Sequence, residues 1–284
     1  MPELPEVETT TKKLQPLVGK QIKSFNGDWP RGARISTLNF IRRDIAGRKI
    51  ISISRVGKSI LFKLAVRSAK DEERILAFHQ RMSGRLLIVE SRSKNHESRK
   101  SEEKHVRVKI LFLGGAELLF IDPRKFGVVW YGKPEEVMRD TYFSSLGADA
   151  LAVPFKEFRE RLVGHKGMLK AILLRQDIFA GIGNIVADEM LWEAKIHPKR
   201  NALTLGEKEI KALFMAMKTV LKRSIKAQGT TLRDWRHPDG ESGNFQNLMR
   251  VYGQKGKLCK RCGHKITRMV VVGRGTWVCP NCQH

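Results

Sequence analysis

The residues best suited to chemistry stand at the start of the chain, where Pro2 is followed by Glu3. A chain that opens Met-Pro loses its initiator methionine readily, because the second residue is small. Pro2 would then carry a terminal secondary amine, whose pKa of about 8 leaves some free base at neutral pH. Such an amine condenses with an aldehyde-level carbon to an iminium, which is a strong electron sink. Glu3 is placed to protonate an oxygen of the same substrate.

The same stretch also fits the start of a helix. Pro5 is a favourable first helical residue, and Glu6 and Glu8 suit the positive end of a helix dipole. For Glu6 a catalytic and a structural interpretation stay equally open. For Pro2 and Glu3 taken alone the structural interpretation is favoured, so the rest of the chain must decide.

Four cysteines near the end of the chain predict a metal site. They form two pairs separated by sixteen residues: Cys259-x2-Cys262 and Cys279-x2-Cys282. This spacing is typical of a four-thiolate zinc site, which has no open coordination position and is therefore structural. The segment between the pairs is long enough for a β-hairpin that carries Arg268 and Arg274. Four free thiols are the disfavoured alternative.

The charge of the chain points to a polyanionic partner. Lys and Arg number 54 against 29 Asp and Glu, a formal net charge of +25, and nucleic acid is the first candidate. A solvated cationic surface or a membrane surface is the alternative, but no basic amphipathic helix with an aromatic face favours a membrane. No apolar run reaches about 18 residues and no signal peptide is visible, so we expect a cytoplasmic protein.

The hydrophobic pattern changes near residue 132. Before it, short alternating runs predict an antiparallel β-sandwich over residues 20–131, interrupted by a polar, exposed loop at 90–104. After it, apolar periodicity predicts helices, which we place at 155–162, 168–176, 185–195 and 207–228. Gly229 is expected to end the last one. The fold class is therefore α+β and multidomain, with predicted domains at 1–132, 133–248 and 249–284.

Two loops could contact nucleic acid. Gly181-Ile-Gly183-Asn184 precedes a helix, where backbone N–H groups can bind a phosphate, or where the glycines simply allow a tight turn; Asn184 is expected to be the N-cap. Arg124 and Phe126, in a turn after an apolar strand, suit insertion into a duplex, although solvated cations on a hairpin turn are the alternative.

Two isolated residues have weaker signals. Met82, in the run Gln80-Arg-Met-Ser-Gly84, is a candidate second wedge, although a methionine near a strand end is more often core. Lys58 is a candidate phosphate ligand, and the alternative is a surface lysine at a strand start.

Taken together, these motifs resemble the formamidopyrimidine-DNA glycosylase family over essentially the whole chain. The resemblance rests on the opening Pro-Glu-Leu-Pro-Glu-Val-Glu, Lys58, the run at 82–84, the turn at 122–127, the loop at 181–184 and the finger with Arg274. It implies an N-terminal β-sandwich, a helix-two-turn-helix domain and a zinc-finger hairpin. It also implies a bifunctional glycosylase and AP lyase that excises oxidised purines such as 8-oxoguanine and formamidopyrimidines from double-stranded DNA. One structural zinc and no catalytic metal or organic cofactor are implied.

The resemblance also assigns roles. It makes Pro2 the nucleophile, Glu3 the general acid, Lys58 a proton donor and phosphate contact, and Arg274 a phosphate contact tied to the second elimination; Glu6 joins the catalytic candidates. Met82, Arg124 and Phe126 would fill the gap left by the flipped nucleotide, and Asn184 and Lys166 would bind the DNA backbone. The segment 239–245 would close over the extruded base. A monomer associated with the nucleoid is expected.

Some positions depart from the family pattern. Arg81 stands where relatives often carry glycine, Arg175 replaces a common Asp, and Glu103 falls where a DNA-contacting His is usual, with His105 nearby as the substitute. These departures put damage preference and one backbone contact in question. The alternatives are an endonuclease VIII-like enzyme for oxidised pyrimidines, whose members typically start Pro-Glu-Gly-Pro-Glu, a non-catalytic DNA-binding module, and an RNA-binding zinc protein.

Overall fold

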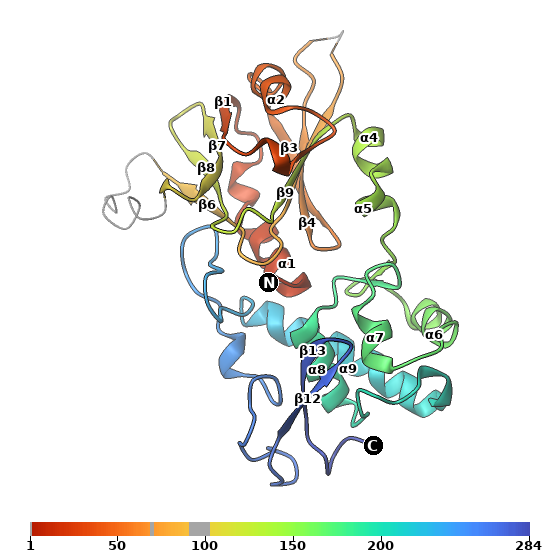
Figure 1. Cartoon of the computed structure of the whole chain (residues 1–284). Helices are drawn as coiled ribbons and strands as arrows, with labels where there is room; N and C mark the ends of the chain where they lie inside the picture. Colours follow the sequence, from red (N-terminus) through yellow and green to blue (C-terminus); the bar gives the residue numbers. More distant parts are fainter. Residues whose placement is uncertain (1, 69–70, 91–102) are drawn as a thin grey trace. The chain divides into compact units, whose positions relative to one another are not determined.

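The structure is a computed structural model that describes residues 2–68, 71–90 and 103–284 (Figure 1). The chain forms two compact units, which are described separately. The first contains Pro2, Glu6–Ser144 and Thr230–Gly243; the second contains Glu3–Pro5, Ser145–Gly229 and Asn244–His284. Most of the predicted loop at 90–104 lies outside the described residues.

The first unit is built on two β-sheets. One has the strand order β2-β9-β5-β4-β3 and the other has the order β1-β7-β8-β6. The strands are β1 (Ile22–Gly27), β2 (Ala33–Arg34), β3 (Ile50–Val56), β4 (Ser59–Leu64), β5 (Arg74–His79), β6 (Arg85–Val89), β7 (Val106–Phe112), β8 (Glu117–Ile121) and β9 (Val128–Gly132). Side chains from both sheets share one core, which includes Phe25, Phe62, Phe78, Phe120 and Tyr131. The predicted antiparallel sandwich is confirmed, apart from the short parallel pairing of β2 with β9.

Short helices accompany the sheets. They are α1 (Leu4–Lys13), η1 (Gln15–Leu17), η2 (Pro30–Gly32), α2 (Leu38–Asp44), α4 (Pro134–Arg139) and α5 (Thr141–Ser144). All five residues of β9 are buried, because one face lines the sandwich core while Trp130, on the other face, packs against Phe143 of α5. Such two-sided burial explains why this strand is a continuous apolar run without alternation.

The second unit is mainly helical and ends in a hairpin. Its elements are β10 (Ala148–Asp149), α6 (Phe155–Val163), α7 (Leu169–Leu174), β11 (Phe179–Ala180), α8 (Asn184–Glu193), η3 (Ala202–Thr204), α9 (Glu207–Lys226), η4 (Phe245–Asn247), β12 (Thr267–Val271) and β13 (Arg274–Val278). The four predicted helices and the hairpin are all present, with ends shifted by one or two residues. Gln228 and Gly229 both have positive φ, 61° and 76°, and lie just after the end of α9, as predicted for Gly229.

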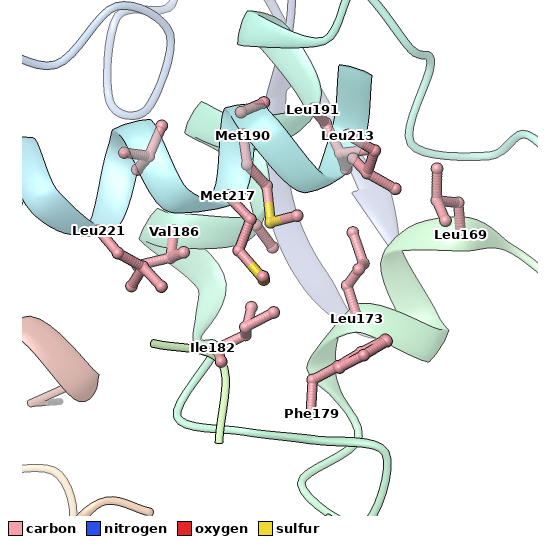
Figure 2. Close-up of a cluster of buried hydrophobic side chains, with 14 of the residues drawn as sticks. Leu169, Leu173, Phe179, Ile182, Val186, Met190, Leu191, Leu213, Met217 and Leu221 are labelled. Carbon is pink, nitrogen blue, oxygen red and sulfur yellow. The ribbon is translucent and has the colours of Figure 1, made fainter. Parts of the chain in front are cut away.

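Helices α7, α8 and α9 enclose the core of this unit (Figure 2). Leu173 of α7, Val186 and Met190 of α8, and Met217 and Leu221 of α9 point toward one another there. Eight of the ten residues of α8 are buried, from Ile185 to Trp192. A helix buried on every side has no polar face, so its charged residues need partners inside the protein.

Buried ion pairing attaches the hairpin to α8. Lys170 and Asp188 are both fully buried, with Nζ of Lys170 2.5 Å from Oδ1 of Asp188. The same ammonium donates to Oγ1 of Thr276 at 2.8 Å, and the Trp277 N–H donates to the other Asp188 oxygen at 3.0 Å. Burial raises the pKa of Asp188, and Lys170 opposes that shift. Strand β13 thus supplies a further hydrogen-bond partner to each of the two buried charges.

Removing one partner of this pair should be far worse than removing both. Asp188→Ala leaves the Lys170 charge buried, and we expect it to lower the free energy of unfolding by about 3–5 kcal/mol. The double variant Lys170→Met, Asp188→Leu should lose less than the single variant. Urea unfolding followed by tryptophan fluorescence measures both. If the single and the double variant lose the same free energy of unfolding, the unpaired charge of Lys170 is not what destabilises the single variant.

Candidate active site

Glu3 is bound to the start of α8 through its side chain. Its Oε1 accepts the Ile185 N–H at 2.9 Å, its Oε2 accepts the Val186 N–H at 3.0 Å, and the residue is 3% exposed. These N–H groups have no partner inside the helix, and the helix dipole favours a negative charge at this end. A carboxylate held by two backbone donors has one fixed orientation.

The glycine loop before α8 is shaped to admit the N-terminal stretch. Gly181 has a φ of +104°, its carbonyl accepts the Leu4 N–H at 3.1 Å, and a Cβ there would overlap Leu4. A Cβ on Gly183 would overlap the Glu3 carboxyl group. Gln176 braces the loop, since its side chain bonds Gly181 N at 3.0 Å and Ile182 O at 2.9 Å. Both positions must therefore be glycine so that the N-terminal stretch can approach the loop closely. The anion bound at the N-terminus of α8 is the Glu3 carboxylate.

The prediction that Asn184 caps α8 is wrong. Gly183 is the N-cap residue, and Asn184 is the first residue of the helix. The side-chain amide of Asn184 instead donates to the Gly275 carbonyl in the finger hairpin at 2.9 Å. Glu3 supplies the capping oxygens to Ile185 and Val186, which lie 182 and 183 positions later in the chain, a relation that no local sequence pattern reveals.

Pro2, Glu6 and Lys58 are buried in the first unit. Glu6 accepts the Thr230 N–H at 2.7 Å, which ties α1 to the segment 230–243. Lys58 is 5% exposed in the turn between β3 and β4, where Gly57 has a φ of +56°. The alternative of a surface lysine is therefore excluded for Lys58, while a structural role for Glu6 is evident.

A buried aromatic cluster supports the Lys58 turn. Tyr142 packs edge-on against His79 and stacks on Trp130, with ring centroids 5.2 and 5.3 Å apart. Burial raises the pKa of Tyr142, and hydrogen bonds with Ser59 and the Lys58 backbone oppose the shift. Burial, with the cations Arg81 and Lys58 nearby, lowers the pKa of His79 to about 3. His79 is thus neutral, and its Nδ1 accepts the Arg81 N–H at 2.9 Å.

The turn at 122–127 is organised by one buried carboxylate. Asp122 accepts the N–H groups of Phe126 and Gly127, both at 2.7 Å, and that of Arg124 at 3.2 Å. It also accepts the Ser83 hydroxyl at 2.5 Å, which joins the turn to the run that contains Met82. The sequence shows the turn but not that Asp122 holds it, because a carboxylate at a turn start is common without such a role.

The candidate wedge side chains project from these rigid turns. Met82 is 44% and Phe126 45% exposed, so the alternative that Met82 is a core residue is wrong. The Arg124 guanidinium lies 4.5 Å from the centroid of the Phe126 ring. Arg81 has a φ of 52°, a conformation that glycine adopts without strain. A glycine at this position, as the resemblance to the family predicts, would adopt the same conformation.

The remaining predicted contacts lie on different parts of the two units. Lys166 and Arg274 are exposed in the second unit, while His105 is half-buried in the first, where its carbonyl accepts the Asp122 N–H at 2.9 Å. Arg175, a departure from the family pattern, forms an ion pair with Asp177. Within 239–245, Phe245 belongs to the core of the second unit. Residues 239–242 are exposed in the first, where Asp239 pairs with Lys13.

The four cysteines come together at the base of the finger hairpin. Their sulfurs lie within 4.8 Å of one another, with Cys259 and Cys282 3.9 Å apart and Cys262 and Cys279 3.5 Å apart. Tetrahedral zinc with bonds of about 2.3 Å needs sulfurs about 3.8 Å apart, so the donor set fits. The indole N–H of Trp192 on α8 donates to Cys259 Sγ at 3.4 Å, a further support of that ligand.

Family models match three consecutive parts of the chain. A formamidopyrimidine-DNA glycosylase N-terminal domain matches residues 1–129, the H2TH domain of that enzyme matches 146–235, and a zinc finger found in FPG and IleRS matches 256–284. The formamidopyrimidine-DNA glycosylase of Desulfitobacterium hafniense is 38% identical over 286 residues, with all of both chains covered. That of Bacillus subtilis is 38% identical over all of this chain and 99% of its own.

The chain belongs to the formamidopyrimidine-DNA glycosylase family. Members of this family are DNA glycosylases with AP lyase activity that act in base excision repair of oxidised purines. The fold agrees: Lactococcus lactis Fpg bound to DNA with an abasic site matches with a TM-score of 0.86 at 32% identity, over 99% of each chain. MutM bound to DNA with carbocyclic 8-oxo-G matches with a TM-score of 0.85, also at 32% identity over 99% of each chain.

Family membership also decides between earlier alternatives. It establishes a structural zinc at the finger, which the four sulfurs fit. It excludes the interpretation as an RNA-binding zinc protein, which accounted only for the charge and the finger. No helix in the described parts of the chain is long and apolar enough to cross a membrane.

Neutral His79 should make stability sensitive to acid. Its folded-state pKa of about 3 lies below the unfolded value of about 6.5, so the unfolded chain binds a proton that the folded chain does not. As the pH drops from 6.5 toward 3, the contribution of His79 should lower the free energy of unfolding by about 1.4 kcal/mol per pH unit. Urea unfolding of His79→Gln should show a shallower pH dependence. The unaltered protein, measured over the same pH range, is the reference for this slope.

Removing zinc should loosen the finger from α8. Treatment with a strong chelator should release one zinc ion per chain, because the four thiolates form a single site. The fluorescence of Trp192, which donates to a ligand sulfur, should change in step, and added zinc should restore it. Metal analysis of Cys279→Ser should show no bound zinc. A full complement of zinc in that variant would contradict the site.

Proposed function

We propose that this chain excises oxidised purines with Pro2 as the nucleophile and Glu3 as the acid. The Pro2 nitrogen attacks C1′ of the damaged nucleotide, the bond from C1′ to the base breaks, and the base leaves as its anion, which takes a proton from water. The Glu3 carboxylate takes the proton that the Pro2 amine loses and passes it to the sugar ring oxygen as the bond from C1′ to that oxygen opens. The product is an iminium between Pro2 and C1′.

The iminium then drives strand cleavage. It acidifies C2′, and loss of a C2′ proton is followed by β-elimination, which breaks the bond from C3′ to its phosphate oxygen. A second elimination breaks the bond from C5′ to its phosphate oxygen, and water hydrolyses the iminium to free Pro2. Lys58 contacts a phosphate and donates a proton, and Arg274 binds a phosphate during the second elimination. Glu6 holds α1 in place through Thr230.

One observation carries this proposal. The residue after Pro2 has its carboxylate fixed by two backbone N–H groups of α8 and its neighbour Leu4 bonded to Gly181. Pro2 is thus joined directly to a residue whose carboxylate has one fixed orientation. Nucleophile and acid need such fixed geometry, because misplacement by about 1 Å can cost a hundredfold in rate.

DNA engagement is assigned to exposed groups. Met82, Arg124 and Phe126 fill the space left by the extruded nucleotide, and their rigid turns support this use. Asn184 and Lys166 bind the DNA backbone, and His105 takes the place of the usual histidine. Asn184 also bonds the hairpin that carries Arg274, so the two contacts share one support.

The wider organisation is proposed on the same basis. The chain acts as a cytoplasmic, nucleoid-associated monomer, with a catalytic domain at 1–132, a helix-two-turn-helix domain with the lesion-capping loop at 133–248 and the finger at 249–284. The net charge of +25 favours sliding along DNA by non-specific attraction to phosphates.

Oxidised purines are the preferred substrates, and oxidised pyrimidines are the competing class. The chain opens Pro-Glu-Leu-Pro-Glu, as in the purine-specific group. Lactococcus lactis Fpg has also been solved with DNA that contains an oxidised pyrimidine. Single-turnover rates on matched duplexes with 8-oxoguanine or thymine glycol opposite their partners decide the preference. A faster rate on thymine glycol would contradict the purine assignment.

Borohydride trapping tests the nucleophile directly. Incubation with a duplex that holds 8-oxoguanine opposite cytosine should give a reduced covalent adduct, because borohydride traps an iminium. Its intact mass should match the chain without Met1, and peptide mapping should place the adduct at Pro2. Pro2→Gly should bind the duplex but lose at least about a hundredfold in excision rate.

Pro16→Gly, an exposed proline in η1, is the matched control and should keep its activity. An adduct that maps to a lysine, or full excision by Pro2→Gly, would contradict the role of Pro2. Lesion binding that depends on salt but gives no product would support a non-catalytic DNA-binding module instead.

A further inference from the structure

A hollow of about 340 Å³ lies in the second unit, lined by the end of α8 and by the exposed face of α9. Its lining residues are mostly small or apolar: Ala194, Ala212, Met215, Ala216 and Thr219, together with Glu193 and Lys195. The exposed face of a helix normally carries polar side chains, yet Met215 is 55% exposed near the middle of α9. An exposed methionine beside a hollow is typical of surfaces that bind another chain, because its flexible thioether adapts to a partner.

The shape of the hollow is fixed by contacts on both sides. On the α8 side, the Arg261 guanidinium donates to the Trp192 carbonyl at 2.8 Å, and the Lys195 carbonyl accepts the His284 N–H at 3.1 Å. On the α9 side, Ala216 is 4% exposed and belongs to the hydrophobic core of the second unit. The core side chains of α8 and α9 in Figure 2 hold the two helices together. The hollow is therefore a preformed site.

The charge around the hollow is positive. Glu193 is the one carboxylate among its lining residues, and its Oε2 already lies 3.7 Å from Nη1 of Arg223. Lysines line the hollow or flank it along the exposed face of α9: Lys195, Lys208, Lys211 and Lys222. In the described ranges 2–68, 71–90 and 103–284, none of these four lysines forms an ion pair. The three lysines of α9 cover about 21 Å of helix, so a matching ligand carries negative charges on both sides of an apolar group.

The hollow lies away from the proposed DNA contact of the same unit. Asn184 is the first residue of α8, whereas Glu193 is the last. A helix of 10 residues is about 15 Å long, so the hollow lies at the far end of α8 from Asn184. Phosphates are bound by N–H and O–H donors, which the methyl groups of the alanines and of Met215 do not supply. An acidic peptide therefore fits this surface better than DNA does.

We infer that this hollow binds an acidic peptide segment of a partner protein. One large apolar side chain of that segment packs against Met215 and the alanines, and its carboxylates pair with the lysines of α9. The hollow stays open while the chain is bound to DNA, a statement that rests on the proposed function and its DNA contact at Asn184. The surface thus gives a DNA-bound chain a second attachment, to another protein.

Fluorescence anisotropy tests the inference on the protein saturated with an uncleavable duplex that holds a tetrahydrofuran abasic analogue. The duplex occupies the phosphate-binding surfaces, so an acidic probe cannot bind there non-specifically. The probe is a short fluorescent peptide of aspartates and glutamates around one phenylalanine, and a second peptide has serine in place of the phenylalanine. The unaltered protein should bind the serine peptide roughly tenfold more weakly, because the apolar anchor is lost.

The variant Met215→Glu tests the apolar contact. It should bind the phenylalanine peptide roughly tenfold more weakly and should no longer distinguish the two peptides, because both changes remove one contact. The matched control is Met138→Glu, which places the same charge at an exposed methionine of α4. The control should keep the full preference for phenylalanine.

The lysines are tested with a double variant. Lys211→Gln, Lys222→Gln should bind both peptides roughly fivefold more weakly at low salt and should leave the ratio between the peptides unchanged. Lys23→Gln, Lys49→Gln is the control, since it removes the same charge from exposed positions of the first unit. Met215→Glu and Lys211→Gln, Lys222→Gln should excise 8-oxoguanine at the rate of the unaltered protein, which shows that both variants are folded.

Three outcomes would overturn the inference: the phenylalanine peptide does not bind, it binds no more tightly than the serine peptide, or Met215→Glu keeps the preference for phenylalanine. Displacement of the bound peptide by added undamaged duplex would assign the surface to DNA and would overturn the inference as well. If the unaltered protein neither binds the abasic duplex nor excises 8-oxoguanine, the proposed function is contradicted. Peptide binding is then measured on the free protein, where the same three outcomes decide.

Discussion

The hydrogen bonds from the start of α8 to the Glu3 carboxylate are the interaction on which the second unit's part of the site depends. The two donors belong to a helix that is almost wholly buried, so they cannot be satisfied by water. The catalytic candidate is thus also the cap of a core helix. The same two bonds stabilise the helix and orient the carboxylate, which means that chemistry and stability cannot be changed independently at this residue.

Further along helix α8, other buried carboxylates also bind distant segments of the second unit. Asp188 binds Lys170 and the backbone of β13, while Glu189 accepts N–H groups from Arg250, Val251 and Tyr252 at 2.8–3.0 Å. Burial raises the pKa of Glu189, and these three backbone donors oppose the shift. One helix therefore holds the N-terminal carboxylate, the finger hairpin and the stretch that leads into the finger. Zinc stabilises the far end of the same assembly, where Trp192 contacts Cys259.

Periodic and closely spaced features could be predicted from the sequence. Helix α9 and the strands of the sandwich repeat apolar residues at the right intervals, and the cysteine spacing alone defines the finger. Helix α2 could not be predicted from the sequence, because it is seven residues long and buries only Ile41. The N-cap of α8 is not Asn184, as its position in the sequence predicts, because the capping carboxylate of Glu3 lies far away in the chain. The pairing of Lys170 with Asp188 was missed for the same physical reason: partners for buried charges are chosen by the fold and leave no local pattern.

The turn around Asp122 has a consequence for how the protein meets intact DNA. Four donors on one buried carboxylate leave the backbone of Phe126 almost no freedom, although its ring stands 45% exposed. A stiff probe loses little conformational entropy when it enters a base stack. The resistance it meets is therefore set by the DNA and hardly at all by the protein. Under the proposed roles, the Phe126 ring probes every base pair in the same conformation. The protein then pauses at the base pairs that open most easily, which are those at damaged or mismatched steps.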